Sequence, residues 1–198
     1  MVVFGITGGS GSGKTSVSKM LEKLGVHIID TDVIAHEIVE PNSECLNELV
    51  DYFGDSILND DKTLNRKKLA SIAFSDKQKT EALINITHKY IKAEVVKDIN
   101  TTDAELVGID GAVIIGSNVE PLCEFIVSVI ADKQSRITRI KTRDNITDEQ
   151  AIQRINAQND DEFYKENSMY IIYNNGDIAQ LESDVVGLFN KIKGNSFE

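Results

Sequence analysis

The sequence has few cysteines and no long apolar run. Cys45 and Cys123 are the only cysteines among 198 residues, so we expect two free thiols packed as small apolar side chains and no disulfide framework. No apolar run approaches the ~18 residues that a membrane span requires. No basic segment precedes the apolar residues Val2–Ile6, so a signal peptide is not expected. These absences predict a cytoplasmic protein outside the membrane.

Positive charge is also scarce. The chain has 21 Lys and Arg against 32 Asp and Glu, a net charge of −11. A surface this acidic repels phosphodiester backbones, which makes nucleic acid a poor partner. The exception is Lys133–Arg143, where five cations occur without an acid. A small anionic substrate that binds near this segment is therefore still compatible with the composition.

The order of apolar runs predicts an α/β fold with a parallel sheet. Val2–Thr7 reads as a buried strand, Lys14–Leu24 as an amphipathic helix and Val26–Ile29 as a second strand. Such a βαβ unit builds parallel sheets. Further strands are expected at Leu106–Asp110, Phe125–Ala131 and Met169–Tyr173.

Between the second and third strands only helical patterns occur. The apolar positions of residues 33–100 predict four helices, which suggests a helical lobe inserted into the α/β core. After the core resumes, Thr147 and Gln150 form a capping box that opens a helix, and Asp177 is expected to cap the final helix.

The strongest motif is a complete phosphate-binding loop. Gly8–Thr15 matches G-x-x-x-x-G-K-[ST] and lies between a predicted strand and a predicted helix. Glycines let backbone N–H groups approach a phosphate, Lys14 supplies a charge between the β- and γ-phosphates, and the Thr15 hydroxyl is a ligand for Mg²⁺. The expected ATP-binding residues are Gly8, Gly9, Gly11, Ser12, Gly13, Lys14, Thr15 and Ser16.

Two aspartates at strand ends are candidates for phosphoryl transfer. Asp32 follows the second strand, where a carboxylate can orient an acceptor hydroxyl and take its proton. It could instead cap the helix that begins near Val33, and Asp30 is expected to be structural. Asp110 ends the third strand and could hold Mg²⁺ directly or through water, or could be a turn residue.

Four arginines are candidates for a lid that closes on the phosphates. Arg136, Arg139 and Arg143 recur at i, i+3 and i+7 and share one helical face, and Arg154 lies one helix later. Arginines can stabilise the charge that spreads over the γ-oxygens, although a charge run is also typical of a solvated face.

Two further features leave alternatives open. Asn174-Asn175-Gly176 could be a plain turn or could present polar groups to an adenine edge. From the residues alone, His88 reads as a packed core histidine. No Zn site and no Ser-His-Asp arrangement is visible.

Taken in order, these segments resemble the dephospho-coenzyme A kinase family over nearly the whole chain. The P-loop is shared by many protein families, whereas the segments Leu24–Pro41 and Arg143–Gln158 are far more specific to this one. The resemblance is carried by GITGGSGSGKT (Gly5–Thr15), LGVHIIDTDVIAHEIVEP (Leu24–Pro41), LNRKKLASIAF (Leu64–Phe74), Ile86–His88, RDNITDEQAIQRINAQ (Arg143–Gln158) and YIIYNNGD (Tyr170–Asp177).

The resemblance implies a three-layer P-loop kinase core of residues 1–32 and 105–198, a helical CoA-binding lobe of residues 33–104 and a lid of residues 133–158. It implies transfer of the γ-phosphate of ATP, with Mg²⁺, to the ribose 3′-hydroxyl of dephospho-CoA, by a monomer or small homo-oligomer. Asp32 then matches the proposed base, Arg143 the lid arginine and His88 a histidine near the substrate. Residues 174–176 match the loop beside adenine, and Asp110 lies on the substrate side.

Two departures from the family pattern keep other functions under consideration. The pattern D-x-P-L-L-[FY]-E is replaced by Asp110–Gly116, without its proline and glutamate, and Lys89 replaces a proline after His88. A shikimate-like or nucleoside kinase is the alternative. A nucleotide-binding module without an acceptor is the third possibility, although no N-K-x-D motif of a GTPase occurs.

Overall fold

The computed structural model describes residues 1–195, the side chain of residue 195 excepted. The chain divides into two compact units. One comprises Met1–Ile29 and the segment from Thr102 onward, and the other comprises Asp30–Thr101. We refer to them as the P-loop unit and the helical unit.

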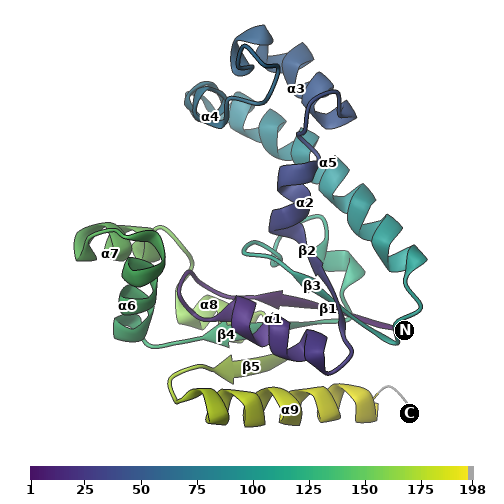
Figure 1. The fold of residues 1–198 in the computed structure, drawn as a ribbon, viewed down its shortest axis with the longest axis vertical. Coiled ribbons are helices and arrows are strands. Elements are labelled where there is room, and N and C mark those ends of the chain that lie inside the picture. Colours follow the sequence, from purple (N-terminus) through teal and green to yellow (C-terminus); the bar gives the residue numbers. More distant parts are fainter. Residues whose placement is uncertain (196–198) are drawn as a thin grey trace. The chain divides into compact units, whose positions relative to one another are not determined.

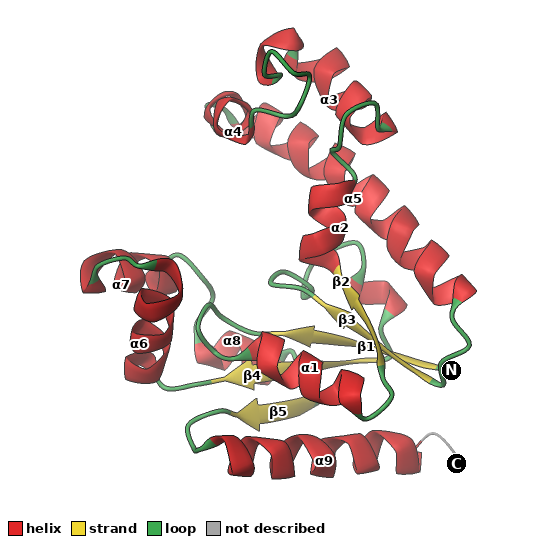
Figure 2. Ribbon diagram, in the orientation of Figure 1, coloured by secondary structure: helices red, strands yellow, loops and turns green. Residues whose placement is uncertain are grey.

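The P-loop unit is built on a five-stranded sheet (Figures 1 and 2). Its order is β2-β3-β1-β4-β5, and the pairs β1–β3, β1–β4 and β4–β5 are parallel. This arrangement confirms the predicted α/β class with a parallel sheet. The strands are β1 (Val2–Thr7), β2 (His27–Asp30), β3 (Leu106–Asp110), β4 (Phe125–Ile130) and β5 (Tyr170–Tyr173).

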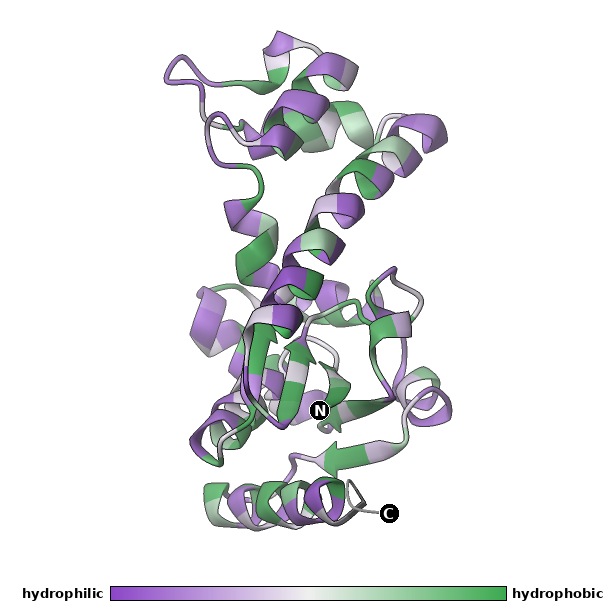
Figure 3. Cartoon of the chain, turned by 90° about the vertical axis from the view of Figure 1, so that its right-hand side faces the viewer, coloured by the Kyte–Doolittle hydropathy of each residue, from purple (hydrophilic) through white to green (hydrophobic). Residues whose placement is uncertain are grey.

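The central strands are apolar along most of their length (Figure 3), as expected for strands covered on both faces. Phe4 and Ile6 of β1 are fully buried in the core beneath α1 and α9. Gly5 allows close packing on the sheet, since a Cβ there would lie 2.5 Å from Cδ1 of Ile126. Apolar burial therefore fixes the strand whose carboxyl end leads into the P-loop.

In its described residues the P-loop unit has five α-helices, four of which follow the expected signals closely. The capping box of Thr147 and Gln150 is present, and Asp177 Oδ1 accepts from the N–H of Gln180 at 2.9 Å. A six-residue helix, α8, was not predicted, because it is too short to show an apolar period; Asp160 caps it. The helices are α1 (Lys14–Lys23), α6 (Lys133–Asp144), α7 (Asp148–Asn156), α8 (Asp161–Glu166) and α9 (Ile178–Asn195), with a 3₁₀ turn at Glu120–Leu122.

The helical unit contains four α-helices. Its first helix begins at Thr31, two residues before the expected start, because Asp30 and not Asp32 is the cap. The helices are α2 (Thr31–Glu37), α3 (Glu44–Phe53), α4 (Arg66–Ala73) and α5 (Lys77–Thr101), with a 3₁₀ turn at Asp55–Ile57. In the part of the chain that the structure describes, none of the helices has the length and apolarity that crossing a membrane would take.

Candidate active site

The P-loop follows β1 and leads directly into α1. Gly11 and Gly13 have φ angles of 78° and 96°, in the left-handed region that glycine adopts without strain. Within residues 1–195, α1 begins at Lys14 with no side-chain cap on its N-terminus. The N–H groups of Ser16 and Val17 donate to the carbonyl oxygen of Gly13, and the helix dipole favours an anion at this end of α1.

Close packing behind the loop explains why it must be glycine-rich. A Cβ on Gly13 would lie 2.0 Å from Nδ2 of Asn174, and one on Gly11 would lie 2.7 Å from the carbonyl oxygen of Arg136. Real Cβ atoms do not approach other atoms so closely. The glycines therefore serve the packing of the loop as well as its approach to phosphate.

Three consecutive carbonyl oxygens of the loop accept hydrogen bonds from side chains. Ser10 O accepts from Nε of Arg136 at 2.9 Å, and Nη1 of Arg139 lies 3.2 Å from both Gly11 O and Ser12 O. Nδ2 of Asn174 donates to Ser12 O at 2.7 Å. These contacts hold the carbonyl groups of the loop against α6 and the loop after β5.

Lys14 and Asp110 form an ion pair at the carboxyl end of the sheet. Asp110 lies opposite Ile6 in the β1–β3 register, and only 4% of its side chain is exposed. Thr15 and Ser16, the next residues of the P-loop motif, are exposed. The structure thus brings together the predicted phosphate-binding lysine and the predicted metal-binding aspartate.

The two aspartates after β2 have different roles in the backbone. Oδ1 of Asp30 accepts from the N–H groups of Asp32 and Val33, at 2.9 and 3.1 Å. Asp30 is therefore the N-cap of α2, and the capping alternative for Asp32 does not hold. Asp32 is exposed in the first turn of α2, within the helical unit.

The four candidate lid arginines separate into two pairs. Arg136 and Arg139 contact the P-loop, whereas Arg143 and Arg154 share the carboxylate of Asp144. Nε and Nη2 of Arg143 donate to the two oxygens of Asp144 at 2.7 and 2.9 Å. Hydrogen bonds from Arg143, with the charges of both arginines, lower the pKa of Asp144 to about 2.

The loop after β5 is tied to the end of β4. The N–H of Asn174 donates to Ile130 O at 2.8 Å, and Oδ1 of Asn175 accepts from the N–H of Asp132 at 2.8 Å. Asn174 is buried, while Asn175 and Gly176 are exposed. Since Asn174 also reaches the P-loop, this loop is joined to the phosphate-binding loop.

A pocket of about 280 Å³ in the helical unit is lined by both His88 and a cation. Most of its wall is apolar, and burial lowers the pKa of His88. Arg66, the first residue of α4, also lines it. Arg66 was not predicted as a site residue from the sequence. The signal that could have indicated it was its position at the start of a helix within the segment Leu64–Phe74. The lining residues are Ala35, Ile38, Val39, Leu49, Leu64, Arg66, Leu69, Ala70, Phe74, Leu83, Thr87, His88 and Ile91.

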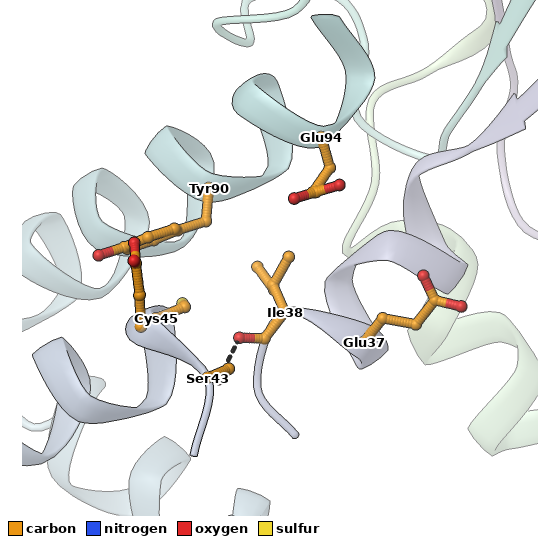
Figure 4. A pocket seen from close by; sticks show the side chains of 7 residues that line it. Glu37, Ile38, Ser43, Cys45, Tyr90 and Glu94 are labelled. Carbon is orange, nitrogen blue, oxygen red and sulfur yellow. Dashed lines mark hydrogen bonds between the residues drawn. The ribbon is translucent and has the colours of Figure 1, made fainter. Parts of the chain in front are cut away.

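A second pocket of the helical unit is lined by acids and a buried thiol (Figure 4). Burial raises the pKa of Cys45 to about 11, so this thiol stays protonated and unreactive near neutral pH. Beside it, Nζ of Lys89 and the hydroxyl of Tyr90 both donate to Oε2 of Glu48, at 2.6 and 2.7 Å. Lys89, which replaces the family proline, thus joins α5 to α3.

The segment that departs from the family pattern also lines a pocket, of about 200 Å³, in the P-loop unit. Ile114 is fully buried there, and Val113 is 70% exposed. The hydroxyl of Thr7 donates to Ala112 O at 3.3 Å, which ties the segment to the end of β1. The residues that replace the family pattern, Ala112 to Ile115, thus supply apolar lining to this pocket.

Known proteins resemble this chain along its whole length. The model of the family Dephospho-CoA kinase matches residues 2–180. A dephospho-CoA kinase of Lactobacillus johnsonii is 34% identical over 95% of this chain and 96% of its own length. One of Listeria monocytogenes is 34% identical over 96% and 97% of the two chains.

Solved structures agree with this result. Dephospho-CoA kinase from Campylobacter jejuni has a TM-score of 0.69 and 26% identity, over 98% of both chains. TT1252 from Thermus thermophilus has a TM-score of 0.83 over 96% and 97% of the chains, and a shikimate kinase from Acinetobacter baumannii has one of 0.56 over 100% and 96%. At 23% and 18% identity, these last two establish the fold alone.

Proposed function

Because this chain belongs to the dephospho-CoA kinase family, we propose that it phosphorylates the ribose 3′-hydroxyl of dephospho-CoA with ATP, giving coenzyme A in the last step of its synthesis. Its family makes the chain a kinase that uses ATP. The observation that carries the ATP half of the proposal is the P-loop, with its carbonyl groups bonded to side chains and Lys14 beside Asp110.

Backbone N–H groups of the P-loop would hold the β-phosphate. Lys14 would leave Asp110 and lie between the β- and γ-phosphates, where it neutralises the charge that develops during transfer. The N-terminus of α1, from Lys14 to Ser16, adds a favourable field. The adenine would lie against the loop of residues 174–176, which Asn174 joins to the P-loop.

The residues present suit a magnesium ion. The hydroxyl of Thr15 and the carboxylate of Asp110 are oxygen ligands of the kind that Mg²⁺ prefers, and water could join Asp110 to the ion. Bound Mg²⁺ would neutralise charge on the β- and γ-oxygens. The close pairing of Lys14 with Asp110 supports the assignment, since it marks a carboxylate able to stabilise a cation there.

We assign Asp32 as the residue that orients the acceptor hydroxyl and takes its proton. Asp30 supplies the cap of α2, so helix capping does not account for Asp32. Asp32 follows a strand end of a sheet whose neighbouring strand β3 ends in Asp110. Ligands of parallel sheets bind beyond these carboxyl ends, which supports a catalytic position.

We assign residues 133–158 as the lid and Arg143 and Arg154 as its phosphate-binding arginines. Both are held together on Asp144. As the γ-phosphate oxygens gain negative charge, the two guanidinium groups would bind them and stabilise the transition state. Arg139, bonded to Asn174 and the P-loop, would steady the adenine side of the site.

We assign residues 33–104 as the acceptor-binding lobe and residues 1–32 and 105–198 as the nucleotide-binding core. The pocket around His88 has an apolar wall that suits the pantetheine arm of dephospho-CoA, and Arg66 supplies a cation for its pyrophosphate. His88 has a lowered pKa and is half-buried, so it would act as a neutral hydrogen-bonding group near neutral pH.

The remaining expectations concern the setting of the enzyme. We place it in the cytoplasm, because both thiols are free, which suits a reducing compartment. We expect a monomer or small homo-oligomer that binds no nucleic acid, given its net charge of −11.

The test is a transfer assay with the purified chain, Mg²⁺ and ATP labelled in the γ-phosphate. We expect labelled coenzyme A, with the phosphate located on the 3′-oxygen by mass fragmentation. Shikimate and nucleosides serve as competing acceptors, and the Lys14→Ala variant serves as the blank. Turnover of shikimate or a nucleoside, with none of dephospho-CoA, would reject the proposal.

A further inference from the structure

We propose that Arg136 is a positioning residue that holds the P-loop in its phosphate-binding shape from behind and does not contact the transferred phosphoryl group. The inference rests on the proposed function, because it presupposes that the loop binds nucleotide phosphates. Arg136 is buried, at 5% exposure, although arginine is rarely buried unless its charge and its donors have partners. Its partners therefore indicate what it does.

Each part of the guanidinium group faces an acceptor of the protein. Nε donates to the carbonyl oxygen of Ser10 at 2.9 Å, and Nη2 donates to Oε1 of Gln158 at 3.4 Å. Nη1 lies 3.5 Å from Oδ1 of Asp161. The fork of Arg136 thus connects the P-loop to two residues that follow α7, and each of its three nitrogen atoms faces an acceptor of the protein.

Ser10 is held through both of its backbone groups. Its N–H donates to Oε1 of Gln158 at 2.7 Å, while its carbonyl group accepts from Arg136. Oε1 of Gln158 therefore accepts from Ser10 and from Arg136, which closes a ring of three hydrogen bonds. This ring fixes the orientation of the peptide groups on either side of Ser10.

The surroundings of Ser10 leave this arrangement little freedom. A Cβ on Gly9 would lie 2.3 Å from Nη2 of Arg136, and one on Gly11 would lie 2.7 Å from Arg136 O. At Gly11 the atom met belongs to the backbone of α6, so the loop fits there only with glycine, whereas a Cβ on Gly9 would displace the guanidinium group of Arg136. A phosphate cradle needs its N–H groups to point to one side, so fixing these peptides prepares the loop for the ligand.

Substitution by lysine separates this role from a role of charge alone. Lysine keeps the positive charge but cannot donate in a planar fork to Ser10, Gln158 and Asp161. Gln158→Ala removes the shared acceptor and changes no charge. If the ring positions the loop, both variants should weaken binding of ADP, and the double variant should be little worse than either one alone.

The experiment measures the Kd of ADP, together with kcat and the KM of ATP and of dephospho-CoA, for wild type, Arg136→Lys, Gln158→Ala and the double variant. We expect each single variant to raise the Kd of ADP and the KM of ATP roughly tenfold, with kcat reduced less than about threefold. The KM of dephospho-CoA should stay near the wild-type value. Lys191→Gln, which removes an exposed charge on α9, outside the lid, is the control and should match wild type.

Other outcomes would overturn the inference. A large loss of kcat in Arg136→Lys, with unchanged Kd of ADP, would place Arg136 on the transferred phosphoryl group. Wild-type kinetics in both single variants would make the ring irrelevant. If wild type itself failed to bind ADP, the proposed function would fail first, which distinguishes the two failures.

Amide hydrogen exchange in the ligand-free wild type tests the ring without any substitution. The N–H of Ser10 should exchange slowly, because Gln158 accepts from it and the site is partly buried. Circular dichroism and melting curves show whether each variant is folded before its kinetics are compared. Fast exchange at Ser10 would contradict the ring even if the variants proved too unstable to assay.

Discussion

The P-loop unit and the helical unit hold their candidate binding residues by different means. Three polar side chains around the P-loop are buried and bonded: Asp110 is 3% exposed, Arg136 5% and Asn174 7%. In the helical unit, the pocket around His88 is mainly apolar, and its cation, Arg66, is exposed. The first site depends on the direction of hydrogen bonds, and the second depends on shape and apolar contact.

The difference between apolar and directional contacts explains where departures from the family pattern can be accommodated, also within the P-loop unit, to which residues 112–115 belong. Apolar substitution at residues 112–115 preserves a wall, because apolar contacts are not directional. Lys89, which replaces a proline, forms an ion pair with Glu48 of α3. In the P-loop, by contrast, a single Cβ on Gly13 would meet Asn174 at 2.0 Å. The effects of substitutions in the two units should therefore differ in magnitude and in the substrate whose binding they change.

The largest effect is expected for Lys14→Ala. Removing the ammonium group eliminates a charge at the transferred phosphate and leaves Asp110 buried without its ion-pair partner. We expect kcat/KM for ATP to fall by at least ~10³-fold. Steady-state kinetics measure this, with Lys19→Ala on the exposed face of the same helix as control. A value within tenfold of wild type would remove Lys14 from the site.

Asp32→Asn comes next and should separate catalysis from binding. If Asp32 takes the proton of the acceptor, kcat should fall by ~10²-fold while the Kd of ATP stays unchanged. Asp30→Asn is a matched control, since asparagine caps helices as well as aspartate does. Pre-steady-state and equilibrium titrations measure both quantities. Equal activity of the two variants would leave Asp32 without a catalytic role.

Arg66→Gln tests whether the helical unit binds the acceptor and not ATP. We expect the KM of dephospho-CoA to rise about tenfold, because a charge-assisted contact to pyrophosphate is lost, with the KM of ATP unchanged. Lys67→Gln, an exposed neighbour on α4, should behave as wild type. An increase in the KM of ATP instead would contradict the assignment of ATP binding to the P-loop unit and acceptor binding to the helical unit.

Asp144→Asn should have the smallest effect of these substitutions. We expect a small loss of stability, because the side chains of Arg143 and Arg154 are largely exposed. We expect Tm to fall by less than about 2 °C at pH 7. The arginines lower the pKa of Asp144 to about 2, so its stabilising contribution is complete above the unfolded pKa near ~4 and is lost as pH falls through about 2.

Melting curves of wild type and Asp144→Asn between pH 2 and pH 7 test this expectation. The difference in Tm should be largest near neutral pH and should disappear at the acid end. Asp103→Asn, at an exposed aspartate, controls for the loss of a surface charge. A difference that grows as pH falls would contradict the lowered pKa of Asp144.

The sequence anticipated the parts of the molecule that rest on local patterns. The P-loop, the strand before it and the capping box of Thr147 and Gln150 were predicted correctly, because turns, caps and apolar periods are properties of neighbouring residues. The role of Asp30 as the cap of α2 became certain only from the structure, because either aspartate could have capped that helix.

Local chemistry is what the sequence determined by itself: a phosphate-binding loop, acids at strand ends and a concentration of arginines in an acidic chain. The tertiary structure alone decided the strand order β2-β3-β1-β4-β5, and with it the pairing of Lys14 with Asp110. It also decided which arginines hold the P-loop and which share Asp144. Helical spacing shows which side chains share a face, but packing between distant segments determines what that face contacts.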